Sequence, residues 1–257
     1  MQTSSAGRGS LILAIVLLLG GCATQQSTRV SYDPWEPLNR ALFEVNDVGD
    51  HYVLKPVAKG YKWLLPSFIR RGVTNFSQNL TAPGSAINHF LQGKPKSGFG
   101  ELTRFLFNST IGIGGLIDVS AHAGLERDEE DFGQTFAVWG APAGPYVVIP
   151  FLGPRTLRDA LAIPLNFLAD PLWHYDVKSV RNPLYVLRLI NLRANLLSAE
   201  AFIKDSKDPY VTIRESYLQN RNYQIYDGDP PIDDDFYDGF EDDFQDDEES
   251  APDDATN

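Results

Sequence analysis

Apolar residues at helical spacing, interrupted repeatedly by proline or glycine, are the feature that most constrains the fold of this chain. From Tyr32 onward, residues such as Val53, Val57 and Tyr61 recur at the three- and four-residue intervals that define one face of a helix. Pro66 can begin the next helix, because proline fits the first helical turn. Further helices are expected at 84–91, 97–109, 153–168, 181–203 and 208–222. The pattern predicts one mainly α domain of short, interrupted helices, spanning about residues 32–225.

The sequence offers little material for a β-sheet. Tyr146–Ile149 is the one clear β-prone apolar run, and Pro145 and Pro150 enclose it. Because proline cannot donate a ladder hydrogen bond, this run is expected to form a short or edge strand. No internal repeat is visible along the chain.

Two apolar stretches, Ile111–Ile117 and Trp139–Pro145, contain glycine or proline inside them. Short helices and turns of this kind leave apolar faces that are hard to bury completely. Tryptophans stand at such junctions, and tryptophan is favoured where a surface is half apolar and half wet. An ordinary core with surface loops and a domain at a membrane interface both fit this composition.

The N-terminus has the features of an exported lipoprotein. Arg8 precedes Leu11–Leu19, an apolar run of about nine residues, which is typical of a signal peptide and about half the length of a membrane-spanning helix. Leu19-Gly20-Gly21-Cys22 then resembles the lipobox of bacterial lipoproteins. We expect residues 1–21 to be a signal peptide, Cys22 to carry lipid, and residues 22–31 to form a polar tether.

Cys22 is the only cysteine, so the chain offers it no disulfide partner. A core cysteine beside an ordinary cleavage site is the alternative. Residue 23 is alanine and not aspartate, which by the sorting rule for such lipoproteins implies transfer to the outer membrane. Several acyl chains, at about 0.8 kcal/mol per buried methylene, make such an attachment durable.

The net charge of −12 comes mainly from residues 226–257, which hold fifteen of the 34 acidic residues and no lysine or arginine. Such a segment cannot bury enough apolar surface to offset chain entropy, so a disordered acidic tail is expected. Aromatic residues such as Phe236 and Phe240 interrupt it, which leaves a short partner-binding segment as the alternative. Without the tail the chain is nearly neutral, and it offers no basic stripe for nucleic acid.

Signals for catalysis, metal or cofactor binding are weak, and none of the three is expected. The pattern Gly-x-Ser-x-Gly is absent, with Pro83–Ile87 as its nearest approach. The four histidines lack metal-ligand spacing, and Asp118 with His122 is an isolated pair. Glu126–Asp131 is interpreted as a solvated charged turn. A lipid hydrolase stays an alternative, since catalytic triads need not be sequential, and so does a structural envelope-tethering lipoprotein.

A set of short segments, in order over about residues 32–222, resembles the VacJ/MlaA family of outer-membrane lipoproteins. The segments are Asp33–Arg40, Asn75-Phe76, Asn79-Leu80, Pro83, Phe90–Gly93, Arg104–Val119, Phe132–Phe136, Gly144–Phe151, Leu157–Asp159 and Asp208–Tyr210. The acidic tail lies outside the resemblance.

The resemblance implies a ring-like bundle of short and bent amphipathic helices around a central amphipathic channel, embedded from the periplasmic side in one leaflet of the outer membrane. It also implies removal of mislocalised phospholipids from the outer leaflet and their transfer to a periplasmic lipid-carrier protein, which maintains lipid asymmetry. A trimeric porin is the implied membrane partner. No reaction and no cofactor are implied.

Two groups of residues are candidates for the lipid path. The glycine-rich run with Ile111, Gly112, Gly114 and Gly115 suits close helix packing or a flexible channel wall. The first helix mixes polar and apolar residues on one side, so it can form the lip that lipid crosses or plain surface. Its candidate residues are Asn39, Arg40, Phe43 and Asn46.

Overall fold

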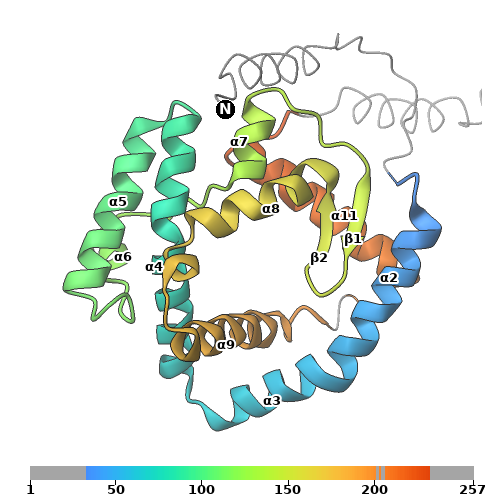
Figure 1. Ribbon diagram of the computed structural model, residues 1–257, viewed down its shortest axis with the longest axis horizontal. Helices are drawn as coiled ribbons and strands as arrows, with labels where there is room; N and C mark the ends of the chain where they lie inside the picture. Colours follow the sequence, from blue (N-terminus) through green and yellow to red (C-terminus); the bar gives the residue numbers. More distant parts are fainter. Residues whose placement is uncertain (1–32, 201–202, 204–205, 232–257) are drawn as a thin grey trace, which may run out of the picture. The chain divides into compact units, whose positions relative to one another are not determined.

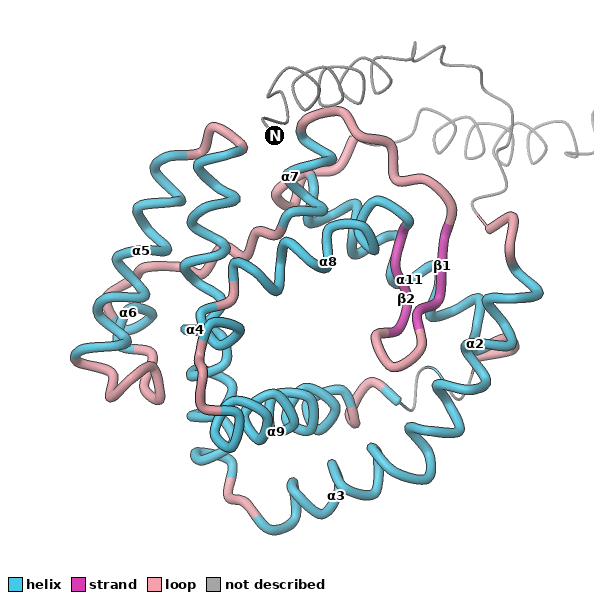
Figure 2. Tube along the Cα trace, in the orientation of Figure 1, coloured by secondary structure: helices cyan, strands magenta, loops and turns pink. Residues whose placement is uncertain are grey.

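The computed structural model describes residues 33–200, 203 and 206–231. Cys22, the signal peptide, the tether and the tail beyond residue 231 lie outside the described residues. The described part is mainly helical, and its helices are arranged around a central opening (Figures 1 and 2). The prediction of a mainly α, ring-like bundle is therefore confirmed.

The first side of the ring is one nearly continuous helical rod. Helix α2 (Glu36–Gly49) passes into a π-helical turn, η1 (Asp50–Leu54), and then into α3 (Lys55–Leu64). Pro56 lies in the first turn of α3 and has no N–H to donate. The wider π turn before it, in which the Lys55 N–H bonds to the Asp50 carbonyl, accommodates this interruption without ending the rod.

Helix α4 (Ser67–Leu91) is the spine of the ring and packs against α5 (Pro95–Thr110), α7 (Phe132–Val138), α8 (Leu157–Ala169) and α9 (Lys178–Leu196). The prediction of a separate helix over 84–91 was wrong, because α4 continues through Pro83. Proline removes one helical hydrogen bond, and packing along both halves of α4 outweighs that local cost. A short loop then turns the chain into α5.

The expected strand is confirmed as β1 (Tyr146–Ile149), and it pairs antiparallel with β2 (Gly153–Thr156), with Tyr146 opposite Thr156. The prediction of helix from residue 153 was wrong, since helix α8 begins only at Leu157. Gly153, the first residue of β2 after the hairpin turn, has a positive φ of 79°, a conformation that glycine adopts without strain. Two short helices, α6 (Val119–His122) and α7, were also not predicted.

The remaining elements follow strong local signals. Thr156, Asp170 and Asp208 cap α8, the 3-10 turn η2 (Pro171–His174) and α11 (Pro209–Ile225), each accepting a hydrogen bond from a backbone N–H in the first turn. Helix α9 contains Pro183, and α8 contains Pro164. Contacts of α9 with α3 and α4, of α8 with α4 and β2, and of β1 with α2 complete the ring.

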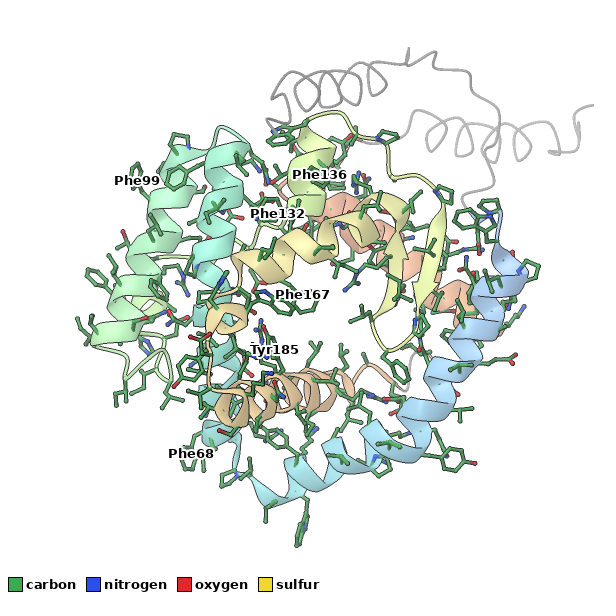
Figure 3. The ribbon with its side chains drawn as sticks, in the orientation of Figure 1. Phe68, Phe99, Phe132, Phe136, Phe167 and Tyr185 are labelled. Carbon is green, nitrogen blue, oxygen red and sulfur yellow. The ribbon has the colours of Figure 1, made fainter. Side chains whose placement is uncertain are left out.

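The distribution of apolar side chains is unusual for a water-soluble bundle. Among the described residues, the buried hydrophobic positions are mainly alanines, and the compact aromatic cluster is Tyr146 and Tyr210 with Val148. Many large apolar side chains are exposed instead, including Trp63 at 88% and Phe68 at 66%. Figure 3 shows Phe68 and Phe99 on the outer side of the ring, with Phe167 and Tyr185 on the inner side. No helix within the described residues is both long and apolar enough to span a membrane.

Candidate functional site

The elements around the central opening line a cavity of about 760 Å³ whose lining is partly charged and partly apolar. We call the charged part of the lining the polar wall, and it includes Asp131, Asp159 and Arg221. The apolar part, called the apolar wall, has side chains from the hairpin turn, α8 and α9: Leu152, Ile163, Phe167, Leu192 and Leu196. A second cavity of about 450 Å³ shares Thr81, Glu129, Arg188 and Leu192 with the first, so the two adjoin. Together they form an amphipathic space that elements far apart in sequence enclose.

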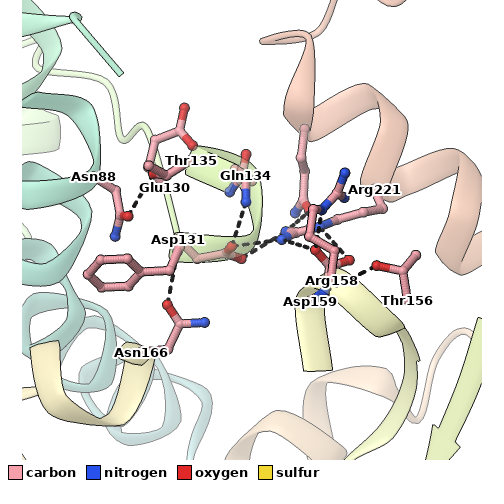
Figure 4. A network of polar contacts seen from close by, with 12 residues as sticks. Asn88, Glu130, Asp131, Gln134, Thr135, Thr156, Arg158, Asp159, Asn166 and Arg221 are labelled. Carbon is pink, nitrogen blue, oxygen red and sulfur yellow. Dashed lines mark hydrogen bonds and ion pairs between the residues drawn. The ribbon is translucent and has the colours of Figure 1, made fainter. Parts of the chain in front are cut away.

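Arg221 organises the polar wall (Figure 4). Its guanidinium donates to both carboxylate oxygens of Asp131, at 2.7 and 2.8 Å, and to both of Asp159, at 3.0 and 3.1 Å. The Tyr217 hydroxyl donates to Asp159 at 2.6 Å, and Arg158 Nε donates to the same carboxylate at 3.2 Å. Asp131 also caps α7 through the Gln134 N–H. The network joins α7, α8 and α11.

The protonation of Asp159 is coupled to this network. Burial alone would raise its pKa, but the charge and hydrogen bonds of Arg221 outweigh burial and lower the pKa to about 2. The pKa of Asp131 is also lowered, because Arg221 outweighs the opposing effect of burial. Both aspartates are therefore ionised throughout the neutral range.

Acid should weaken the fold through Asp159. A lowered pKa in the folded state contributes stability above the unfolded pKa of about 3.9, and this contribution is lost as the pH falls toward 2. The expected loss is about 2 kcal/mol, measured as the free energy of unfolding in detergent at pH 5 and pH 2.5. An Asp159→Asn variant is the control, because it should be less stable at pH 5 and lose less on acidification. Equal acid losses in the two proteins would contradict the assignment.

The interpretation of Glu126–Asp131 as a solvated turn was wrong for its last two residues, Glu130 and Asp131. Glu130 is 7% exposed, accepts a hydrogen bond from Gln92 Nε2 at 2.7 Å and pairs with Lys94 at 2.9 Å. Burial raises its pKa, although Gln92 and Lys94 oppose that effect. A run of acidic residues in the sequence cannot show which carboxylates meet buried donors, because the donors to Glu130 come from the loop between α4 and α5.

The four candidate lip residues of α2 hold the hairpin and α11, and none of them lines the cavities. Asn39 is 2% exposed, donates to the Tyr146 carbonyl at 2.9 Å and accepts from the Val148 N–H at 2.9 Å. Asn46 bonds to the Ile149 carbonyl and the Phe151 N–H. Arg40 pairs with Asp208 at 2.8 Å, and Phe43 packs against Tyr210. These contacts join the first helix to the hairpin and thereby close the ring.

The glycine-rich run after α5 forms a compact turn in which Gly112 and Gly115 leave no room for a side chain. A Cβ on Gly115 would lie 2.6 Å from the buried Asn79 side chain, and one on Gly112 would lie 2.2 Å from the Ile117 carbonyl oxygen. Ile111 and Ile113 are both 65% exposed on the same turn. Like the α2 residues, this run lines neither the central cavity nor the cavity that adjoins it.

The residues considered for chemistry have structural partners. Asp118 caps α6 and binds Arg104 and Asn108, whereas His122 bonds only to the Asp118 backbone carbonyl. Ser85 Oγ donates to the Asp128 carbonyl at 2.9 Å and accepts from the Glu130 N–H at 2.7 Å.

Among the described residues, Asp128, Glu130 and Asp227 could hold a metal ion, their carboxylates lying within 4.8 Å of one another. The Lys94 ammonium already pairs with two of these carboxylates.

Sequence reasoning missed Arg155, Arg188 and Arg221 as cavity residues. Arg188 pairs with Asp170 at 2.5 Å, and both line the central cavity. The available signal was the Leu157-Arg158-Asp159 segment of the family resemblance, which contains two members of the network, Arg158 and Asp159. The three arginines lie on β2, α9 and α11, and only the fold brings them to one cavity.

The fold and the cavity define a class of protein: a ring of helices with an amphipathic space inside and large apolar side chains outside. A family model described as MlaA lipoprotein matches residues 31–224. The chain belongs to the MlaA lipoprotein family, and as a lipoprotein of this family it is membrane-associated.

Relatives and a solved structure agree with this assignment. The intermembrane phospholipid transport system lipoproteins MlaA of Shigella flexneri and Escherichia coli are each 36% identical to this chain, and each alignment covers 83% of this chain and 86% of the relative. A solved structure from work on the structural basis for maintenance of bacterial outer membrane lipid asymmetry is 37% identical, with a TM-score of 0.67. The match covers 75% of this chain and 98% of that chain.

Proposed function

We propose that this chain is an outer-membrane lipoprotein that removes mislocalised phospholipids from the outer leaflet of the outer membrane and passes them to a periplasmic carrier, which maintains lipid asymmetry. The observation that carries the proposal is the central cavity, whose lining is partly charged and partly apolar. The names of its relatives, which describe phospholipid transport, support the same substrate.

The physical argument concerns the cost of moving a lipid between leaflets. A headgroup without polar partners in hydrocarbon costs several kcal/mol. A polar wall such as that around Arg221 and Asp159 would solvate the headgroup, while Ile163, Phe167 and Leu192 would face the acyl chains. The ring thereby offers both ends of a phospholipid a suitable environment without covalent chemistry.

The exposed apolar side chains suit a ring that lies in one leaflet from the periplasmic side. Trp63, Phe68 and Phe99 are each more than 60% exposed, and such a surface is stable when hydrocarbon covers it. Lipid on Cys22 would deliver the domain to the membrane, and the exposed turn at Ile111 and Ile113 would add to its apolar rim. A trimeric porin is the proposed membrane partner. In this proposal the α2 residues Asn39 to Asn46 hold the edge at which the ring closes.

Deleting the gene is expected to raise the amount of intact phospholipid in the outer leaflet, measured by labelling of cell-surface phospholipid. The full chain should restore the low level, and a Cys22→Ala variant should not, because a domain without its lipid is no longer delivered to the membrane. Mass spectrometry of the mature N-terminus checks lipid attachment directly, and an unmodified Cys22 thiol would refute it. Loss of lysophospholipid on deletion would favour the hydrolase, and no lipid change would favour tethering.

A further inference from the structure

Arg155 of strand β2 differs from the other charged residues around the central cavity. Every carboxylate that lines this cavity has a basic partner. The pairs are Glu129 with Arg127, Glu130 with Lys94, Asp131 with Arg221, Asp159 with Arg158, and Asp170 with Arg188.

Arg155 also lines the cavity, but it forms no ion pair within the described part of the chain. Its guanidinium bonds to the adjacent Pro154 carbonyl at 2.8 Å, which leaves most of its donors available. When the charged residues of the lining are counted together with their ion-pair partners, one positive charge, that of Arg155, has no counter-charge.

Nearby carboxylates cannot easily take Arg155 as a partner. Asp159 already accepts bonds from Arg221, Arg158 and the Tyr217 hydroxyl, which use both of its oxygens. The positive charge of Arg155 lowers the pKa of Tyr217, although burial and Asp159 outweigh it and raise that pKa overall. Arg155 thus acts on the polar wall from the hairpin side, with its guanidinium open to a further anion.

We infer that Arg155 binds the phosphate of the phospholipid headgroup inside the central cavity, an inference that rests on the proposed transport function. A phosphodiester carries one negative charge, which matches the single surplus positive charge of the lining. The planar guanidinium offers the paired donors that phosphate oxygens favour. Leu152, from the same hairpin, and Phe167 lie on the apolar wall. The same cavity can therefore bind the phosphate through Arg155 and contact the acyl chains through these apolar side chains.

The test is equilibrium binding of radiolabelled phosphatidylglycerol to the full lipidated protein in detergent, with diacylglycerol of the same acyl chains as the comparison ligand. Arg155→Gln should weaken phosphatidylglycerol binding about tenfold, because it removes a charge-assisted hydrogen bond, and should leave diacylglycerol binding unchanged. Arg155→Met is a second neutral variant that keeps the apolar stem. Arg71→Gln on the exposed side of α4 is the matched control and should bind both ligands like the parent.

The inference is overturned if Arg155→Gln and Arg155→Met bind phosphatidylglycerol as tightly as the parent, or if they lose affinity for both ligands equally. Inorganic phosphate that binds as tightly as phosphatidylglycerol would identify a site for the free anion. Surface-lipid labelling after gene deletion tests transport independently. A raised surface phospholipid level with unchanged Arg155→Gln binding would reject the Arg155 site alone, whereas weakened binding with no surface change would reject transport alone.

Discussion

Replacing Arg221 by glutamine is expected to lower the free energy of unfolding by about 3 kcal/mol. Arg221 is 7% exposed, and its guanidinium is the partner that Asp131 and Asp159 share. Asp159, 4% exposed, would keep Arg158 and Tyr217 but lose two bonds to a cation. A buried carboxylate that loses part of its counter-charge is far costlier than a lost surface pair, which contributes at most about 1 kcal/mol.

The measurement is denaturant unfolding of the full chain in detergent at neutral pH. Arg181→Gln is the matched control, since Arg181 is half-buried on α9, forms no ion pair with a described residue and makes only long hydrogen bonds, at 3.4 Å to the Trp173 carbonyl and 3.5 Å to Asn182. Its expected effect is within about 0.5 kcal/mol. A second readout separates charge from packing, because Arg221→Gln should also reduce the acid sensitivity that comes from Asp159. An Arg221→Gln protein as stable as the parent would show that the network does not hold α7, α8 and α11 together.

Replacing Gly112 by alanine is expected to cost about 3 kcal/mol, at the upper end of overpacking effects. The added Cβ would lie 2.2 Å from the Ile117 carbonyl oxygen and 2.5 Å from the Asn108 carbonyl oxygen. Both are backbone atoms, one in the turn and one in the last turn of α5, so no side-chain rotation relieves the contact. The turn also holds Asn108, which accepts from the Ser120 N–H at 3.0 Å and so positions α6.

Gly100→Ala tests the same chemical change on α5, where a Cβ would meet nothing within 4 Å. There alanine should stabilise the protein by about 0.5–1 kcal/mol, because glycine is unfavourable inside a helix. Thermal unfolding of both variants in detergent provides the comparison. If Gly112→Ala unfolds at the same temperature as the parent, the glycine-rich run is not closely packed. That result would favour its interpretation as a flexible channel wall.

Local signals predicted the parts of the fold that depend on neighbours in sequence. Apolar spacing and Pro66 located the helices on either side of that residue, and the prolines around Tyr146–Ile149 marked the short strand. The second strand was missed because Gly153 and Pro154 have no strand preference of their own, and pairing with β1 determines their conformation. Helix α7 was missed because it lies directly after an acidic run whose last member, Asp131, is its cap.

The candidate site shows the same division. The residues chosen on α2 and in the glycine-rich run form tight structural contacts, whereas the cavity is lined from α4, the hairpin, α8, α9 and α11. No sequence motif marks Arg155, Arg188 or Arg221 as cavity residues. Their importance depends on which carboxylates reach them, and those partners lie as far as 90 residues away, as for Asp131 and Arg221.

The sequence by itself determined the mainly helical class, the family and the expectation of a lipid on Cys22, because periodicity, breakers and short ordered segments are local properties. Only the tertiary structure decided which charges are paired, which glycines are tightly packed and which side chains face the cavity. Ion pairing and close packing depend on distances in space between residues that lie far apart in the sequence. The unpaired charge of Arg155 can therefore be recognised only after every other charge around the cavity has found its partner.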